Sequence, residues 1–188
     1  MCFRTSRLLL LLAGALLLGC AACSASNRFD SDSDAGTVCT SCGSCEEYQP
    51  VSIAQHISGD IVYADPPPVG GQHNSCWASW GVYDSELRAE RWVHNLEHGG
   101  VVFLYRCDEP CPDDVSALEG LVRERPLALL TTYSRLPTRF AVVAWGVRLL
   151  SQCLDTVAFT TFYETHVNRG REMVSSDPPA ACAEFPDL

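Results

Sequence analysis

Residues 93–100 read VHNLEHGG and carry three side chains of types that bind metal ions in proteins. His94, Glu97 and His98 have the H-x-x-E-H spacing of one class of zinc peptidases. On a helix, His94 and His98 would lie on one face about 6 Å apart, whereas on a strand they would stand roughly 13 Å apart. The two histidines can therefore share an ion only if residues 94–98 are helical or tightly turned.

Four of the five histidines lie in the loop-rich first part of the chain, each beside turn residues or this motif. Imidazole is the commonest metal-donating side chain, and several imidazoles that converge form a site for zinc or copper. The candidate ligands are His56, His73, His94, His98 and Glu97. Glu97 is either a ligand or the partner that orients a histidine ligand. The competing interpretation is a structural cluster, because buried polar side chains beside glycine-rich turns often only hydrogen-bond the backbone.

Two functional hypotheses use these residues as metal ligands. The first is a surface-tethered domain that binds copper or zinc for handling or sensing. The second is a metal-dependent hydrolase with Glu97 as general base, which requires Glu97 to be free of the ion. A peptidase of this kind also needs a further ligand, for which Glu164 and Glu172 are available, and a long helix. The diglycine at residues 99–100 would end a helix soon after His98, so it disfavours the peptidase interpretation.

Aromatic residues form a second group in this region: Tyr63, Trp77, Trp80, Tyr83, Trp92, Tyr105 and Trp145. In a third hypothesis, they line a groove that binds a glycan, peptide or protein, and the His/Glu cluster is scaffold. The domain would then be a non-catalytic envelope module. Core packing is the favoured interpretation of the aromatic residues themselves.

Eleven cysteines point to an oxidising compartment, where disulfides are the usual fate of thiols. The number left after signal cleavage and lipidation is odd, so at least one thiol is unpaired within the chain. The disulfide candidates are the local pair Cys107 and Cys111, and Cys153 with Cys182 as a clamp on the C-terminal tail.

Three further cysteines are closely spaced at positions 39, 42 and 45. This run favours disulfide staples at the N-terminal edge of the domain over a thiolate site for copper(I) or zinc. Cys76 follows His73 by three residues, so a Cys–His dyad is a further alternative.

The N-terminus has the pattern of an export signal. Arg4 and Arg7 precede an apolar run over residues 8–18, which is too short for a confident membrane span. The run ends at Gly19-Cys20 like a bacterial lipobox, so Cys20 is the predicted lipidation site; secretion with cleavage after Ala25 is the alternative. We predict a lipoprotein signal peptide over residues 1–19, a Ser/Asp- and Cys-rich tether over residues 20–47 and a single globular domain over residues 48–188.

These features predict a domain in the cell envelope, held to a membrane outside the cytoplasm by its lipid anchor. The formal net charge is −10, so the chain lacks the basic footprint of a nucleic-acid-binding protein.

Hydrophobic patterning predicts an α+β fold: a small mixed or antiparallel sheet, two main helices on one face, and a loop-rich, His-containing first half. The expected strands cover residues 59–63, 101–105, 127–133 and 140–145, with the last two paired antiparallel. The expected main helices cover residues 113–125 and 154–167. A shorter helix begins at Ser85 as its cap and ends at the diglycine. The Pro-rich tail from residue 175 is expected to be irregular.

Several of these stretches occur in an order that resembles a known bacterial family. They are His56 with Gly59, PPPVGGQH at residues 66–73, WGVYD at residues 80–84, VHNLEHGGVV at residues 93–102 and AWG at residues 144–146. The family is catalogued as domain of unknown function 3105, and its members are similar secreted or membrane-tethered proteins. The resemblance implies no established activity. It implies that the matching polar positions are those singled out above as candidate ligands.

Overall fold

The computed structural model describes residues 37–174 and Cys182, and this part of the chain has the predicted α+β fold. Three helices accompany a six-stranded mixed sheet and a separate two-stranded sheet. The strands are β1 (Glu47–Tyr48), β2 (Gln55–His56), β3 (Gln72–His73), β4 (Gly81–Val82), β5 (Val101–Tyr105), β6 (Ala128–Thr132), β7 (Phe140–Ala144) and β8 (Val147–Ser151). The helices are α1 (Ala89–Glu97), α2 (Pro112–Arg123) and α3 (Thr156–His166).

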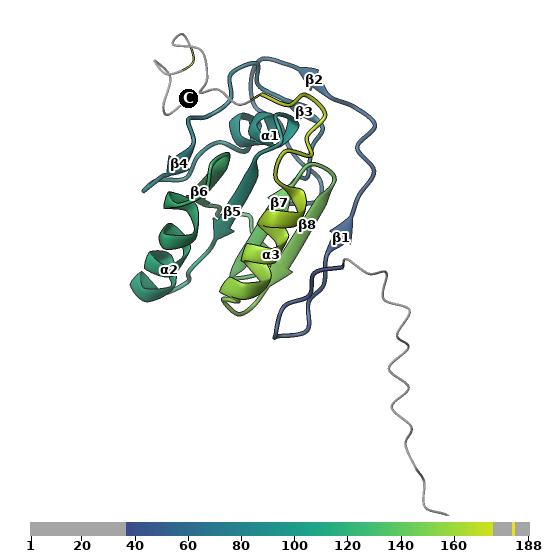
Figure 1. The fold of residues 1–188 in the computed structure, drawn as a ribbon. Coiled ribbons are helices and arrows are strands. Elements are labelled where there is room, and N and C mark those ends of the chain that lie inside the picture. Colours follow the sequence, from purple (N-terminus) through teal and green to yellow (C-terminus); the bar gives the residue numbers. More distant parts are fainter. Residues whose placement is uncertain (1–36, 175–181, 183–188) are drawn as a thin grey trace, which may run out of the picture. The chain divides into compact units, whose positions relative to one another are not determined.

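The large sheet has the order β1-β8-β7-β5-β6-β4, and β5 lies at its centre (Figure 1). Strands β5 and β6 are parallel and are joined by the crossover helix α2, whereas β7 runs antiparallel to both β5 and β8. The prediction that residues 140–145 pair with residues 127–133 is therefore wrong, because β5 lies between these strands. Neighbours in sequence often pair, but the long apolar strand β5 takes the position with two partners.

Helices cover both faces of the large sheet. Along β5, Val101 and Phe103 pack into the core cluster that contains residues of α2 and α3. The alternate residues Val102 and Leu104 pack into a second cluster with α1. The two main helices do share one face, as predicted, and α1 covers the opposite one (Figure 1). The uninterrupted apolar run of β5 follows from burial on both sides.

Three local predictions need correction. Residues 59–63 form a loop and not a strand, and Glu90 Oε1 accepts a hydrogen bond of 2.7 Å from Ile61 N. Helix α1 begins at Ala89 rather than after Ser85, because the backbone before it is tied to β6 by Thr131: Leu87 N donates to Thr131 Oγ1 at 2.9 Å. Strand β8 was not predicted. It forms a hairpin with β7 through a two-residue turn in which Gly146 has a φ of +77°.

The N-terminal edge of the described chain is part of the domain. Val38 belongs to the core cluster of α2 and α3, and Cys42 is bonded to Cys153. Glu46 Oε1 lies 2.8 Å from His166 Nε2, and both side chains are buried. Val38, Cys42 and Glu46, from the stretch assigned to the tether, therefore contact the domain.

Eight cysteines of the described chain form four disulfides: Cys39–Cys45, Cys42–Cys153, Cys76–Cys182 and Cys107–Cys111. The local pair is as predicted, and the first two disulfides staple the N-terminal edge. The predicted pairing of Cys153 with Cys182 is wrong, because each is bonded to a distant cysteine from the first half of the chain.

Disulfides are typical of domains that fold outside the cytoplasm. Among the described helices, none has the length and apolar character needed to span a membrane. The predicted signal peptide, Cys20, Cys23 and the tail from residue 175, apart from Cys182, lie outside the described residues.

Asp155 links the N-terminal edge to the start of α3. Its carboxylate accepts hydrogen bonds from Ala158 N at 2.9 Å and from Ser41 N at 2.6 Å. These two backbone donors hold the pKa of Asp155 below its ordinary value. Because the folded-state pKa is the lower one, the stabilisation is full above the ordinary carboxyl pKa. It is lost as the pH falls through the folded-state value.

We expect Asp155→Ala to lower the free energy of unfolding by about 1 kcal/mol at pH 7, as is usual for loss of a helix cap. Asp155→Asn keeps an acceptor and is expected to lose less. Urea denaturation at pH 7 and at about pH 2 tests the charge, since the difference from wild type should shrink in acid. An equal difference at both pH values would contradict this assignment.

Candidate metal centre

Four side chains converge where the small sheet of β2 and β3 meets helix α1. His56 on β2, His73 on β3, and His94 and Glu97 on α1 each offer one ligand atom, and these atoms all lie within 4.8 Å of one another. His73, His94 and Glu97 are at most 3% exposed, whereas His56 is exposed. Polar side chains this deeply buried need partners or an ion to offset the loss of water.

The pairing of β2 with β3 places two of the histidines side by side. These strands are parallel, with His56 opposite His73 in register. Their ring centroids are 5.0 Å apart, and the His94 ring lies 4.6 Å from the first and 4.7 Å from the second. Three imidazoles thus surround one point, although His56 and His94 are far apart in the sequence.

The end of α1 fixes the other two groups. His94 and Glu97 stand three residues apart in the last helical turn, so their side chains share a face. The predicted diglycine stop is confirmed: Gly99 N donates to Leu96 O, and Gly100 N donates to Asn95 O. Gly99 has a φ of +83°, and a Cβ on Gly100 would come within 2.4 Å of the Trp80 ring. The turn therefore requires both glycines.

Backbone carbonyls orient the two buried rings. His94 Nδ1 lies 2.7 Å from Asn74 O, and His73 Nδ1 lies 2.8 Å from Gly71 O. Since a carbonyl can only accept, each Nδ1 carries the proton and donates it. In a neutral ring, Nε2 then holds the lone pair, which is the tautomer that metal-binding histidines use.

The carbonyl that orients His94 belongs to a segment held against α1. Asn74 N donates to Glu90 O at 2.9 Å. The buried Asn95 amide makes two hydrogen bonds of 2.9 Å with the backbone of Ala78. These contacts fix residues 74–78 and so fix the His94 ring.

The contact between His73 and Glu97 is the most informative in the cluster. His73 Nε2 lies 2.9 Å from Glu97 Oε2, a distance suited to an ion pair. However, the same buried nitrogen has no hydrogen-bond partner among the described residues. With Nδ1 protonated, a neutral ring would face the carboxylate lone pair to lone pair. A cation between the two atoms removes this repulsion, either a proton on Nε2 or a metal ion, and metal–nitrogen and metal–oxygen distances of about 2.0–2.2 Å allow both atoms to bind a metal.

Burial also keeps His94 in the form that binds metals. Desolvation lowers the pKa of His94 to about 3, assisted by the neighbouring His98 and His73 rings and opposed by the Asn74 carbonyl. His94 is therefore neutral at physiological pH, with Nε2 free to donate its lone pair.

His98 lies beside this group and not within it. It caps the C-terminus of α1, and its Nδ1 lies 2.9 Å from Glu172 O. Glu172 N in turn donates to Glu97 O at 2.8 Å, so two hydrogen bonds join the segment after α3 to the end of α1. The close approach requires Gly170, where a Cβ would lie 2.2 Å from Glu97 O. Neither Glu164 nor Glu172, the downstream acids considered for a peptidase, offers a ligand atom to the group.

Two of the candidate aromatic residues contact the cluster, and one lies in the core. The Trp77 ring packs against His94 and His98 with centroids 5.1 Å and 4.5 Å apart, and Trp145 lies 6.4 Å from His73. Trp92 is fully buried. Cys76 is bonded to Cys182, so the Cys–His dyad with His73 does not exist.

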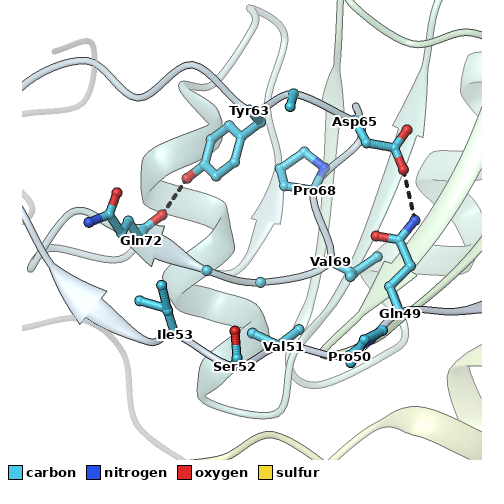
Figure 2. Close-up of a pocket in the computed structure, with 13 residues that line it drawn as sticks. Gln49, Pro50, Val51, Ser52, Ile53, Tyr63, Asp65, Pro68, Val69 and Gln72 are labelled. Carbon is cyan, nitrogen blue, oxygen red and sulfur yellow. Dashed lines mark hydrogen bonds between the residues drawn. The ribbon is translucent and has the colours of Figure 1, made fainter.

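A cavity of about 410 Å³ lies beside the small sheet (Figure 2). It opens between residues 49–53, which lead into β2, and residues 63–72, which lead into β3. Tyr63 spans it and donates from its hydroxyl to Gln72 O at 2.8 Å. The cavity wall thus includes the residues that immediately precede His73.

Neither the curated proteins nor the solved structures include a significant match to this chain. The family described as "Protein of unknown function (DUF3105)" matches residues 56–183, a stretch that begins at His56 and contains all the cluster residues. This match covers well over half of the sequence and agrees with the resemblance seen in the sequence motifs. The chain therefore belongs to the DUF3105 family.

Proposed function

We propose that this domain binds one transition-metal ion, copper or zinc, through His56, His73, His94 and Glu97. The observation that carries the proposal is the 2.9 Å approach of His73 Nε2 to Glu97 Oε2, in which the nitrogen has no hydrogen-bond partner among residues 37–174 and Cys182. Orientation of the two buried rings by backbone carbonyls supports it further, because it directs both Nε2 lone pairs away from those carbonyls.

The donor set indicates the class of ion. Three imidazole nitrogens and one carboxylate oxygen suit divalent ions of borderline softness, such as Zn²⁺ and Cu²⁺. Thiolates would favour copper(I), but every cysteine in residues 37–174 and Cys182 is held in a disulfide. Among divalent ions, copper has the higher intrinsic affinity for such ligands.

The position of Glu97 favours binding over hydrolysis. A hydrolase of the H-x-x-E-H type needs this carboxylate free of the ion, so that it can take a proton from metal-bound water. Here Glu97 Oε2 lies at a ligand position beside His73 Nε2. The inward packing of Trp77 and Trp92 likewise argues against an aromatic binding groove.

Lipidation at Cys20 would place the site at a membrane surface outside the cytoplasm. The four disulfides support this compartment. In this arrangement the domain handles metal ions in the cell envelope.

A metal titration of the purified full-length chain, with disulfides formed, tests the proposal. Zinc and copper(II) are added in turn, and bound metal is measured by mass spectrometry after gel filtration. We expect saturation at one ion per chain. Absence of stoichiometric binding for both ions would refute the proposed function.

A further inference from the structure

We infer that the site exchanges its ion through His56, so that the domain accepts and passes on metal rather than keeping it as a structural component. This inference rests on the proposed function and concerns how the ion enters and leaves. The four candidate ligands differ sharply in how they are held, and that difference is the basis of the inference.

Three ligands form a rigid, buried half of the site. His73 and His94 each have a ring nitrogen fixed by a backbone carbonyl, and Glu97 sits at the end of α1. Strand β3 and α1 are further held by the bond of Asn74 N to Glu90 O. These side chains are at most 3% exposed, so the described part of the chain shields them from solvent.

His56 differs from the other three ligands in its exposure, its hydrogen bonding and the element that carries it. It is exposed, and within residues 37–174 its ring makes no hydrogen bond, only ring contacts with His73 and His94. Its strand is two residues long and pairs with β3 alone in the described part of the chain. The backbone bond of Ile57 N to His73 O, 2.9 Å long, continues this short pairing.

The chain that leads into β2 becomes less well packed toward the strand. Gln49 N donates to Gly146 O and Val51 packs against the core cluster of α1, but residues 49–53 also line the 410 Å³ cavity and Ile53 is 56% exposed. Figure 2 shows Val51, Ser52 and Ile53 along one wall of this cavity, opposite Tyr63 and Pro68. Exposed side chains at Ile53 and His56 beside an open cavity mark a short stretch that opens at lower free-energy cost than the buried ligands. His56 can therefore withdraw while the other three ligands stay in place.

This geometry defines an exchange step. With an ion bound, His56 would leave its coordination position, and an incoming nitrogen or oxygen donor would supply the lone pair that replaces it. The ion keeps its charge, and no oxidant or reductant is needed. Structural zinc sites also use four protein ligands. The proposed site differs because one of its four ligands, His56, is exposed.

Metal transfer to a chelator measures this step directly. The full-length chain loaded with Zn²⁺ is mixed by stopped flow with 4-(2-pyridylazo)resorcinol, and the chelator complex is followed by absorbance. For wild type, we expect the transfer rate to rise with chelator concentration. For His56→Ala, we expect one bound ion per chain but transfer about tenfold faster, since three ligands hold the ion less tightly than four and leave a coordination position open to the chelator. Gln55→Ala, an exposed neighbour on the same strand, should transfer at the wild-type rate.

Three results would overturn the inference while leaving metal binding intact. They are transfer independent of chelator concentration, equal rates for wild type and His56→Ala, and complete loss of binding in His56→Ala, which would make His56 an obligate ligand of a closed site. Failure of wild type to bind metal would refute the proposed function as well, and the equilibrium titration reveals that case separately.

Discussion

Replacing His94 with alanine is expected to abolish stoichiometric metal binding while the domain stays folded. His94 contributes the central ring of the cluster, with His56 and His73 centroids 4.6 Å and 4.7 Å away. Its removal leaves the imidazoles of His56 and His73 and the carboxylate of Glu97. Of these, His56 is on the short strand β2. A metal titration by mass spectrometry, with circular dichroism to confirm folding, measures the loss.

The matched control is His98→Ala. His98 is on the same helix end, is 5% exposed and is a histidine of the same sequence motif, but it offers no atom to the ligand group. We expect this variant to bind one ion per chain, with lower stability because the bond to Glu172 O is lost. If folded His98→Ala also fails to bind, His98 is a ligand. If folded His94→Ala binds like wild type, the metal site is refuted.

The second large effect is expected from the disulfide Cys42–Cys153. This bond joins the N-terminal edge to the chain just before α3 and spans 111 residues. By the chain-entropy relation, closing a loop of roughly 100 residues stabilises a protein by up to about 4.7 kcal/mol. We expect the double variant Cys42→Ser/Cys153→Ser to lose about 4 kcal/mol, because Cys76–Cys182 still restrains part of the same loop. Chemical denaturation without reductant measures the loss.

The local disulfide Cys107–Cys111 provides the comparison. It spans only 4 residues, so its removal frees far less of the unfolded chain. We expect Cys107→Ser/Cys111→Ser to lose about 2 kcal/mol. Equal losses for the two double variants would show that loop entropy is not the source of the stability.

Features set by short stretches of chain were predictable from the sequence. The periodicity of residues 113–125 and 154–167 predicted α2 and α3 because a buried helical face repeats every three to four residues. The apolar run at residues 101–105 predicted β5, and the diglycine after His98 predicted the end of α1. The disulfide between Cys107 and Cys111 was predictable for the same reason, since its partners are neighbours.

The types of residue in the site were also predictable, but which of the candidate residues belong to it was not. The motif places His94, Glu97 and His98 together, yet the helix ends at Glu97 and His98 turns to the carbonyl of Glu172. His73 reaches the site because β3 pairs with β2, and Gly71 O then orients its ring. Each of these outcomes depends on a partner outside the motif.

By itself, then, the sequence determined the helices, the central strand, the family and the chemical types of the candidate ligands. Only the tertiary structure decided that β2 pairs with β3 so that His56 meets His73, that β5 separates β6 from β7, and that Cys153 pairs with Cys42. The physical reason is the distance along the sequence between the residues that determine each feature. Periodicity, caps and turns depend on neighbouring residues, whereas strand pairing and disulfide partners depend on which distant surfaces bury together.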